Sequence, residues 1–404
     1  MRLPAPDWRF ERLDTALNSA PLITEQRPEG RSFLPDAVKA AGCLLIVMHH
    51  LAFYGPMSDV VFESWPLFID GWREYGRLAV QAFLVCSGFL TASSLSRQTL
   101  LAWPQALKLA WRRYARLSIP LLAALTVTVL VTEALRPVFD FPSLSATPSW
   151  DVALAHVFLL QQVLDMESLS AGIWYVAIDF QLYLITLLTL LVISSVVRRH
   201  PALRASALRW QIWLGLAVVS LVRWNLNTDL DNYGIYFFGA YGLGLLAHRV
   251  RQSRIALKGW TVLWALGLLA LWVDPRWRIA TAWGCALLLA AAPERWFTAE
   301  GVSRVIRWGV HKLSAVSYSV FLIHYAVSLL VSAVVTTLWP DDLWANALGM
   351  LLALVLAVWV GAGMYRLTED QPRGVLRWGS WAGIFMLGVA LAMGMSQALG
   401  APAA

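Results

Sequence analysis

The sequence contains little charge and little cysteine. Only 14% of its 404 residues are charged and 58% are hydrophobic, so a soluble chain of this length would leave much apolar surface in water. Its three cysteines, Cys43, Cys86 and Cys285, all lie in apolar segments, where a thiol is typically a small buried hydrophobe. This composition argues against a disulfide scaffold and against a metal site, and it indicates an all-α integral membrane protein.

Residues 1–35 lack the continuous apolar core of a secretory signal. Charges of both signs and several prolines interrupt this segment. We therefore expect a cytoplasmic N-terminal extension, followed by a first span that is not cleaved. The net charge of +7 does not indicate a nucleic-acid partner, because the basic residues lie at the ends of apolar runs rather than on a soluble face.

Eleven apolar runs are long enough to cross about 30 Å of hydrocarbon. They lie near residues 37–54, 78–95, 117–135, 171–196, 210–226, 232–248, 257–273, 277–292, 313–338, 343–366 and 380–399. The run 152–163 is too short to span and is expected to lie in the interface or to re-enter the membrane. Without any internal repeat, these runs predict one helical bundle, a ten-helix core within 36–373 and one further helix within 374–404.

Lysine and arginine are unevenly distributed between alternate loops. If the N-terminus is cytoplasmic, 26 of the 32 basic residues lie on the inner side, and the other six, all arginines, lie on the outer side. Basic residues near span ends are retained in the cytoplasm, so this distribution predicts a cytoplasmic N-terminus and agrees with eleven spans. The longest outer loop, 136–170, is the expected docking region for a large substrate outside the cytoplasm.

The stretch DAVKAAGCLLIVMHH, from Asp36 to His50, places ionisable groups in the first span. Lys39 and His50 are eleven residues apart, so they share one helix face at a separation of roughly 16 Å along the axis. A lysine at this position is typical of a snorkelling anchor. His50 lies too deep for that role, and we interpret it either as a site residue or as a packed structural histidine.

Asp179 lies just inside a later span, at a depth similar to that of His50. A carboxylate that is bonded to an imidazole fixes the tautomer of the ring and raises its basicity. An unpartnered acid at this depth would be costly. We therefore predict that Asp179 pairs with His50, with Tyr183 and Gln181 close by.

Two further polar positions lie within spans. His324 is mid-membrane, with Ser317 two turns earlier, and it is either a site residue or a histidine bonded to a backbone carbonyl between helices. Ser87 precedes Gly88 in the stretch CSGF, where small residues let helices approach closely. Packing is the preferred interpretation of Ser87, and no G-x-S-x-G motif indicates a nucleophilic serine.

Three arginines, Arg112, Arg113 and Arg116, lie at the expected cytoplasmic mouth of the third span. Guanidinium groups bind phosphate through two parallel hydrogen bonds, which makes this cluster a candidate for binding the phosphates of a donor substrate. The positive-inside rule alone also produces such clusters, so an anchoring role remains the alternative.

Several stretches together resemble the acyltransferase 3 family. Asp36, Lys39 and His50 match the register of its first-helix signature, and five further stretches follow in the family's order: FLVCSGFL (83–90), WRRYARLSIP (111–120), WYVAIDFQLYL (174–184), SYSVFLIHYAV (317–327) and YRLTEDQPR (365–373). Two residues depart from the pattern, as do two spacings: the proline after the arginines comes one position late, and an extra residue precedes Pro372. Asp179 stands where the family commonly has glutamate, and Tyr175 where it usually has serine.

The resemblance implies an O-acyltransferase of the bacterial cytoplasmic (inner) membrane. It would transfer an acyl group from acetyl-CoA or another acyl-CoA, bound from the cytoplasm, to a hydroxyl of a carbohydrate or lipid-linked glycan. His50 would be the general base and Asp179 its partner, in a polar cavity that reaches the arginines. The implied donor-binding residues are Lys39, Arg112, Arg113 and Arg116. Further residues expected to line the site are Asp36, Ser87, Tyr183, Ser317 and His324.

Two other classes of function stay open at this point. A transporter or flippase could use Lys39, His50, Asp179 and His324 as a proton relay. An inactive assembly subunit would keep the bundle without binding a donor. Acetyl and succinyl donors both fit, as do direct transfer and an acyl-enzyme, and the oligomeric state is left open.

Overall fold

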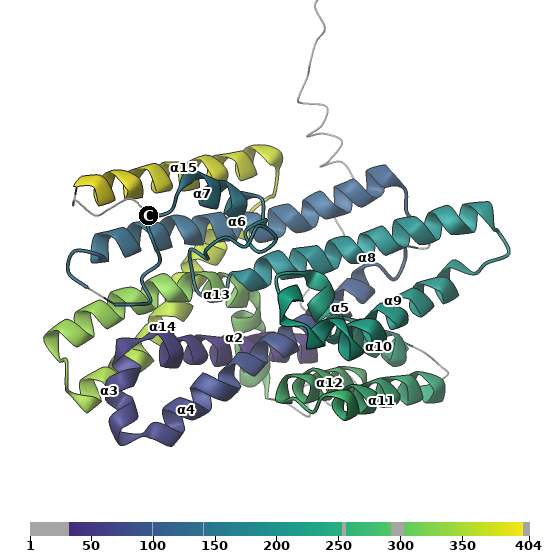
Figure 1. The fold of residues 1–404 in the computed structure, drawn as a ribbon, viewed down its shortest axis with the longest axis horizontal. Helices are drawn as coiled ribbons and strands as arrows, with labels where there is room; N and C mark the ends of the chain where they lie inside the picture. Colours follow the sequence, from purple (N-terminus) through teal and green to yellow (C-terminus); the bar gives the residue numbers. More distant parts are fainter. Residues whose placement is uncertain (1–31, 99, 140, 253–255, 292–302, 399–404) are drawn as a thin grey trace, which may run out of the picture.

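The computed structural model describes residues 32–98, 100–139, 141–252, 256–291 and 303–398, and the regular structure within these ranges is entirely helical (Figure 1). The α-helices are α2 (Phe33–Tyr54), α3 (Pro56–Ser64), α4 (Pro66–Tyr75), α5 (Ala79–Ser94), α6 (Trp103–Leu135), α7 (Trp150–Val157), α8 (Trp174–Arg199), α9 (Ala205–Val222), α10 (Gly234–Gln252), α11 (Ala256–Val273), α12 (Trp277–Ala291), α13 (Arg304–Leu338), α14 (Leu343–Thr368) and α15 (Val375–Ala398). The short 3-10 turns are η2 (Gly76–Leu78), η3 (Trp224–Leu226) and η4 (Thr228–Leu230). The predicted all-α class is confirmed.

Each of the eleven predicted runs coincides with a helix. In the described part of the chain, eight helical segments are long and apolar enough to cross a membrane: Phe33–Tyr54, Pro66–Ser94, Trp103–Leu135, Trp174–Arg199, Ala205–Leu226, Arg304–Leu338, Leu343–Thr368 and Val375–Ala398. The other three runs correspond to α10 and to the shorter apolar helices α11 and α12. The protein is therefore a multipass helical protein, and the count of eleven spans and the orientation stay predictions.

Three short helices lie outside the long apolar runs. α7 has eight residues and is too short to span, as predicted for this region. The sequence analysis did not predict α3 and α4, which fill the region between the first two runs. Each begins with a proline, Pro56 or Pro66, whose fixed φ angle favours the first helical turn. Most of the predicted extension, residues 1–31, lies outside the described residues.

Two helices are much longer than a membrane span needs. α6 has 33 residues and begins at Trp103, whereas the predicted run began at 117. α13 has 35 residues and begins at Arg304. The hydropathy pattern detects only the apolar part of such helices, so it places polar residues of their first turns in loops. The structure extends both helices beyond the apolar run and includes those residues in the bundle.

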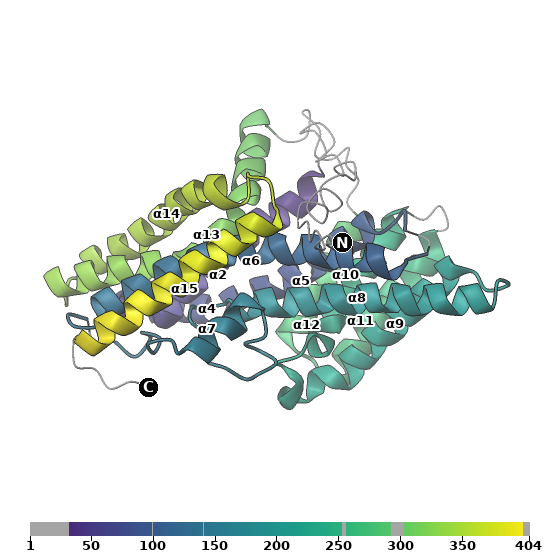
Figure 2. The same cartoon turned by 90° about the horizontal axis from the view of Figure 1, so that it is seen from above.

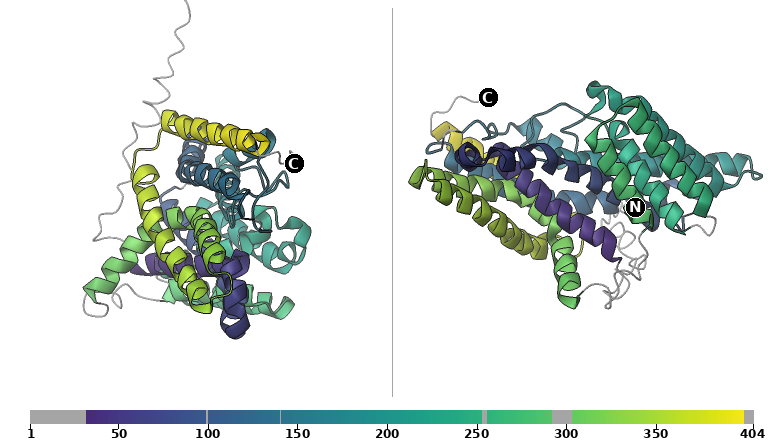
Figure 3. Two further views of the ribbon diagram at one scale, coloured as in Figure 1. Left: turned by 90° about the vertical axis from the view of Figure 1, so that its left-hand side faces the viewer. Right: turned by 90° about the horizontal axis from the view of Figure 1, so that it is seen from below.

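The longest helices pack side by side through the molecule. α13 packs along α14, α2 and α6, while α15 packs along α6 at one edge of the bundle (Figures 1 and 2). α5 packs against α10, and α9 to α12 form a group away from α14 and α15 (Figure 3, right). Side chains from α2, α5, α6, α8 and α13 consequently meet in the interior.

The crossing of α5 and α10 depends on glycine. A Cβ atom on Gly88 would overlap the carbonyl oxygen of Tyr241, and a Cβ atom on Gly244 would overlap the carbonyl oxygen of Val85. The two backbones therefore touch, as small residues at helix interfaces in membranes allow. The prediction that small residues of the CSGF stretch serve helix packing is confirmed at Gly88.

Candidate active site

His50 and His324 form a buried pair between α2 and α13. The Nδ1 atom of His50 lies 2.7 Å from the Nε2 atom of His324, and the two residues are 7% and 0% exposed. The ring centroids are 4.9 Å apart and the ring planes differ by 11°. Stacked rings cannot bring two nitrogens this close, so the rings meet edge to edge in nearly one plane, the geometry of a hydrogen bond.

His324 makes a second contact within its own helix. Its Nδ1 atom lies 2.6 Å from the carbonyl oxygen of Phe321. The structural alternative was a contact with a backbone carbonyl between helices, whereas the carbonyl that His324 contacts belongs to its own helix. Both nitrogens of His324 are engaged, whereas the Nε2 atom of His50 has no hydrogen-bond partner among the described residues.

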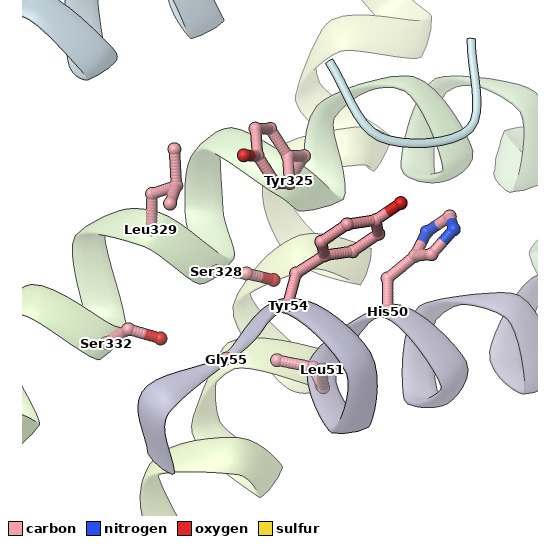
Figure 4. Close-up of a pocket in the computed structure, with 8 residues that line it drawn as sticks. All are labelled: His50, Leu51, Tyr54, Gly55, Tyr325, Ser328, Leu329 and Ser332. Atoms are coloured by element: carbon pink, nitrogen blue, oxygen red, sulfur yellow. The ribbon is translucent and has the colours of Figure 1, made fainter. Parts of the chain in front are cut away.

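A small pocket adjoins His50 at the seam between α2 and α13 (Figure 4). Its cavity volume is about 10 Å³, which is close to the space that a single water molecule needs. Its lining consists of His50, Leu51, Tyr54, Gly55, Tyr325, Ser328, Leu329 and Ser332. Figure 4 shows the hydroxyl end of Tyr54 beside the His50 ring, and the two ring centroids are 5.5 Å apart. The pocket therefore brings hydroxyl groups and aromatic rings together beside His50.

A glycine covers the other side of the His50 ring. Gly172 has a φ angle of +77°, which L side chains rarely adopt, and a Cβ atom there would lie 2.9 Å from Cε1 of His50. Gly172 follows the long predicted outer loop, so this loop ends directly on the histidine. The contact limits how far the imidazole can rotate.

Asp179 contacts Arg113 and Ser87. Its Oδ2 atom lies 2.5 Å from a terminal nitrogen of Arg113, and its Oδ1 atom accepts a hydrogen bond from the Ser87 hydroxyl. Arg113 also lies over the ring of Tyr183, 5.4 Å from its centroid. The predicted pairing of Asp179 with His50 is therefore wrong. The sequence predicted Arg113 at the mouth of a helix. The helix α6 instead begins ten residues before Arg113, so the guanidinium lies inside the bundle beside the Asp179 carboxylate.

An aromatic layer separates the two polar groups. The ring of Tyr175 lies 6.0 Å from Phe83 and 6.0 Å from Phe321, measured between centroids, and Phe321 lies 6.1 Å from His324. Tyr175 is on α8, one turn before Asp179. The lining of the pocket at His50 includes none of the predicted donor-binding arginines.

Arg112 and Arg116 differ from Arg113 in having no acidic partner. Within the described ranges, neither guanidinium forms an ion pair or a side-chain hydrogen bond. Arg116 is exposed, although α6 is largely buried around it. The charges that act on Arg116 include those of Arg373 and Glu369. These two arginines are therefore free to bind an anion.

Lys39 belongs to a separate cluster at the first turns of α2. Its ammonium nitrogen lies 2.9 Å from Oδ1 of Asp36, and this carboxylate also contacts Nδ1 of His311 at 2.8 Å. The Ser314 hydroxyl donates to Asp36 at 2.7 Å. Asp36 is only 2% exposed, so its buried carboxylate needs these partners. Their contacts join the start of α2 to α13. The sequence placed Asp36 near Lys39, but His311 lies too far along the chain to be linked to them by spacing.

Ser317 and Glu369 make two further polar contacts of α13. The Ser317 hydroxyl donates to the carbonyl oxygen of Ser314 at 2.9 Å, which directs it away from the histidine pair. Glu369, just beyond α14, accepts a hydrogen bond of 2.6 Å from Ser319, and burial raises the pKa of its carboxyl. The sequence analysis did not single out Glu369, although the acid in the closing stretch YRLTEDQPR was a signal.

His156 organises the predicted outer loop that precedes Gly172. Its Nδ1 atom lies 2.8 Å from the carbonyl oxygen of Val152, and its Nε2 atom accepts a hydrogen bond of 3.4 Å from the backbone N–H of Leu169. The Nδ1–H group can donate to a carbonyl oxygen in either protonation state, but acceptance at Nε2 requires the neutral ring. Burial lowers the pKa of His156 to about 4, which agrees with this neutral state.

The fold and the buried groups define the class of protein. It is a multipass helical protein that buries a histidine pair, a carboxylate and an arginine between its helices. The chain belongs to the acyltransferase 3 family, because that family's model, described as an acyltransferase domain, matches residues 35–366. This match confirms the family predicted from the motifs and supports acyl transfer as the general reaction. No curated protein and no solved structure matches the chain significantly.

Proposed function

We propose that the protein transfers an acyl group, most simply acetyl, from an acyl-CoA to a hydroxyl of a carbohydrate acceptor. One observation supports this most strongly. His50 is buried beside a pocket, its Nδ1 atom is held by His324, and its Nε2 atom has no hydrogen-bond partner among the described residues. An imidazole held in this way is suited to take a proton from a hydroxyl.

In the proposed reaction His50 acts first as a base and then as an acid. It accepts the hydroxyl proton while the acceptor oxygen forms a bond to the thioester carbonyl carbon. The carbon–sulfur bond then breaks, and the imidazolium returns the proton to the departing thiolate. A hydroxyl is a weak nucleophile at neutral pH, and general-base catalysis of this kind typically contributes about 10²–10⁴-fold in rate.

The donor phosphates would bind at Arg112 and Arg116. Both guanidinium groups lack an acidic partner in the described part of the chain, and Arg116 is exposed. Guanidinium binds phosphate oxygens through two parallel hydrogen bonds. Arg113 and Lys39 already pair with Asp179 and Asp36, so we propose that they add positive potential and do not hold the phosphates directly.

In the proposed mechanism Asp179 does not act as the partner of an imidazole. Its carboxylate holds Arg113 and Ser87, which places the α6 guanidinium in a fixed position between the spans. Asp179 therefore acts in the proposed enzyme as a positioning residue for Arg113. His50 receives its orientation from α13 instead.

The acceptor would approach from the side of the outer loop. The pocket at His50 is lined by the hydroxyl-bearing residues Tyr54, Tyr325, Ser328 and Ser332, which suit the hydroxyl groups of a sugar. This lining supports a carbohydrate or lipid-linked glycan acceptor. The loop-charge pattern supports a cytoplasmic N-terminus and a bacterial inner-membrane location.

A proton-relay transporter is less well supported. A relay needs its titratable groups in a continuous chain of contacts. His50 contacts His324, but Asp179 pairs with Arg113 and Lys39 with Asp36, so the four groups belong to three separate clusters. The contacts favour an acyl-transfer site over a relay.

Thermal unfolding of the full-length protein in detergent, with and without CoA, tests the proposed function. CoA should raise the unfolding temperature in a concentration-dependent way, because a ligand that binds the folded state stabilises it. AMP and an unrelated dinucleotide serve as controls. An absence of CoA stabilisation together with an absence of acetyl-CoA cleavage would argue against an acyltransferase.

A further inference from the structure

We propose that His324 is a positioning residue that fixes the tautomer of His50 and directs its lone pair to Nε2. This inference rests on the proposed function, because it explains how His50 becomes an effective base. It assigns a role in turnover to a residue that does not itself touch the reacting atoms.

The first step concerns the proton on His324. The carbonyl oxygen of Phe321 can only accept a hydrogen bond, and it lies 2.6 Å from Nδ1 of His324. This nitrogen must therefore carry a hydrogen. In a neutral imidazole the other nitrogen, Nε2, then holds a lone pair and acts as an acceptor.

The second step transfers this constraint to His50. Its Nδ1 atom lies 2.7 Å from Nε2 of His324, and two ring nitrogens at this distance require one hydrogen between them. Since the His324 nitrogen is the acceptor, Nδ1 of His50 is the donor. The lone pair of a neutral His50 must therefore be on Nε2, the nitrogen that has no hydrogen-bond partner within the described ranges.

The surrounding structure keeps this arrangement rigid. His324 is fully buried within the 35-residue helix α13, and its own carbonyl oxygen accepts a 2.7 Å hydrogen bond from Ser328. On the opposite side, the backbone of Gly172 approaches Cε1 of His50 so closely that a Cβ atom would not fit. The proximity of Gly172 to the His50 ring opposes a rotation that would exchange the two nitrogens.

The same bond favours the protonated form that arises during turnover. When Nε2 of His50 takes the hydroxyl proton, Nδ1–H becomes a cationic donor to the neutral acceptor on His324. A hydrogen bond with one charged partner is shorter and roughly twice as strong as a neutral one. His324 would therefore both select the tautomer before transfer and stabilise the imidazolium during transfer, while remaining neutral itself.

Three substitutions at one position separate this role from simple packing. In His324→Gln, the side-chain oxygen can reach the position of Nε2 and accept from His50. In His324→Asn, the amide can still donate to Phe321 but is too short to reach His50. His324→Leu fills the space without an acceptor. The full-length protein in detergent is tested with acetyl-CoA, and kcat and the KM for acetyl-CoA are measured for folded, monodisperse fractions.

We expect His324→Leu and His324→Asn to lower kcat by about 100-fold or more, with the donor KM within about twofold of the parent protein. His324→Gln should recover to within about tenfold of the parent. His49→Gln is the matched control, since the His49 ring lies 5.2 Å from the His50 ring between centroids but its Nδ1 atom contacts the Trp72 carbonyl oxygen and not a nitrogen of the pair. It should change kcat little.

Defined outcomes overturn the proposal. If His324→Leu or His324→Asn cleaves acetyl-CoA at nearly the parent rate, the tautomer of His50 does not depend on His324. If the Gln and Asn variants fold equally well and have equal activity, the acceptor at the Nε2 position is not the cause. A parent protein that neither binds CoA nor cleaves acetyl-CoA would instead refute the proposed function itself.

Discussion

The guanidinium of Arg113 and the carboxylate of Asp179 lie 2.5 Å apart in the interior of the helical bundle. Asp179 is almost fully buried, and its second oxygen accepts a hydrogen bond from Ser87. A paired charge in such a place tolerates the loss of both partners better than the loss of one. This ion pair changes the expected roles of two residues. Asp179 pairs with an arginine, and His50 contacts another histidine instead of Asp179.

We predict that Arg113→Met and Asp179→Leu each destabilise the protein by about 3–5 kcal/mol, since each leaves an uncompensated charge in the interior. The double variant should recover most of this loss. Unfolding temperatures of the four proteins in one detergent provide the measurement. If the double variant is as unstable as the sum of the two single variants, the ion pair is not what couples these positions.

Arg112→Gln and Arg116→Gln should weaken CoA binding by about tenfold each, because a charge-assisted hydrogen bond to phosphate contributes roughly 1.5–3 kcal/mol. Neither variant should destabilise the protein without ligand, since neither residue has an ion-pair partner in the described part of the chain. The CoA dependence of the unfolding temperature gives the affinity. Arg199→Gln, which removes an exposed arginine on α8, is the control. Equal effects in all three variants would indicate a general loss of positive charge.

We predict that the protein loses stability in acid because of the buried His156 ring. Its folded pKa is lowered from 6.5 to about 4, so it stabilises the fold fully above pH 6.5 and loses this contribution as the pH falls toward 4. The full effect is on the order of 3 kcal/mol, from the free energy of about 1.4 kcal/mol per pKa unit. His156→Gln should flatten the dependence of unfolding temperature on pH between 6.5 and 4. An unchanged slope would assign the acid sensitivity to other groups.

Gly88→Ala should disrupt the crossing of α5 and α10, because its Cβ atom would overlap the backbone of Tyr241. We expect a loss of more than about 2 kcal/mol, in the range of overpacked cores. Gly363→Ala on α14 is the matched control, since no atom lies within 4 Å of its added Cβ. That substitution should be neutral or stabilising by up to about 1 kcal/mol, as helix propensity predicts. Equal stability of the two variants would contradict the close backbone contact.

The sequence predicts the helices well and the contacts between them less well. Hydrophobic runs located every long helix, because the apolar length needed to cross a membrane is a strong signal. The same signal missed α3 and α4, which are short and polar, and it began α6 at 117 instead of Trp103. This error placed Arg113 at a helix mouth and hid its contact with Asp179.

The sequence predicted several residues of the candidate site but not the contacts between them. His50 and His324 were both identified from their depth in the spans, yet 274 positions separate them along the chain. Helix periodicity relates residues on one helix and contains no information about which face of α13 meets α2. The same limit applies to His311, whose contact with Asp36 joins residues that are 275 positions apart. Contacts between distant spans come from packing, which the structure supplies.

The most direct test of the account is the rate at which the purified full-length protein releases CoA from acetyl-CoA, compared between the parent protein and His50→Ala. The account predicts a loss of about 100-fold or more in His50→Ala, the effect expected for removal of a general base, with CoA still raising the unfolding temperature. A His50→Ala protein that binds CoA and releases it from acetyl-CoA within about twofold of the parent rate would contradict the central role of His50.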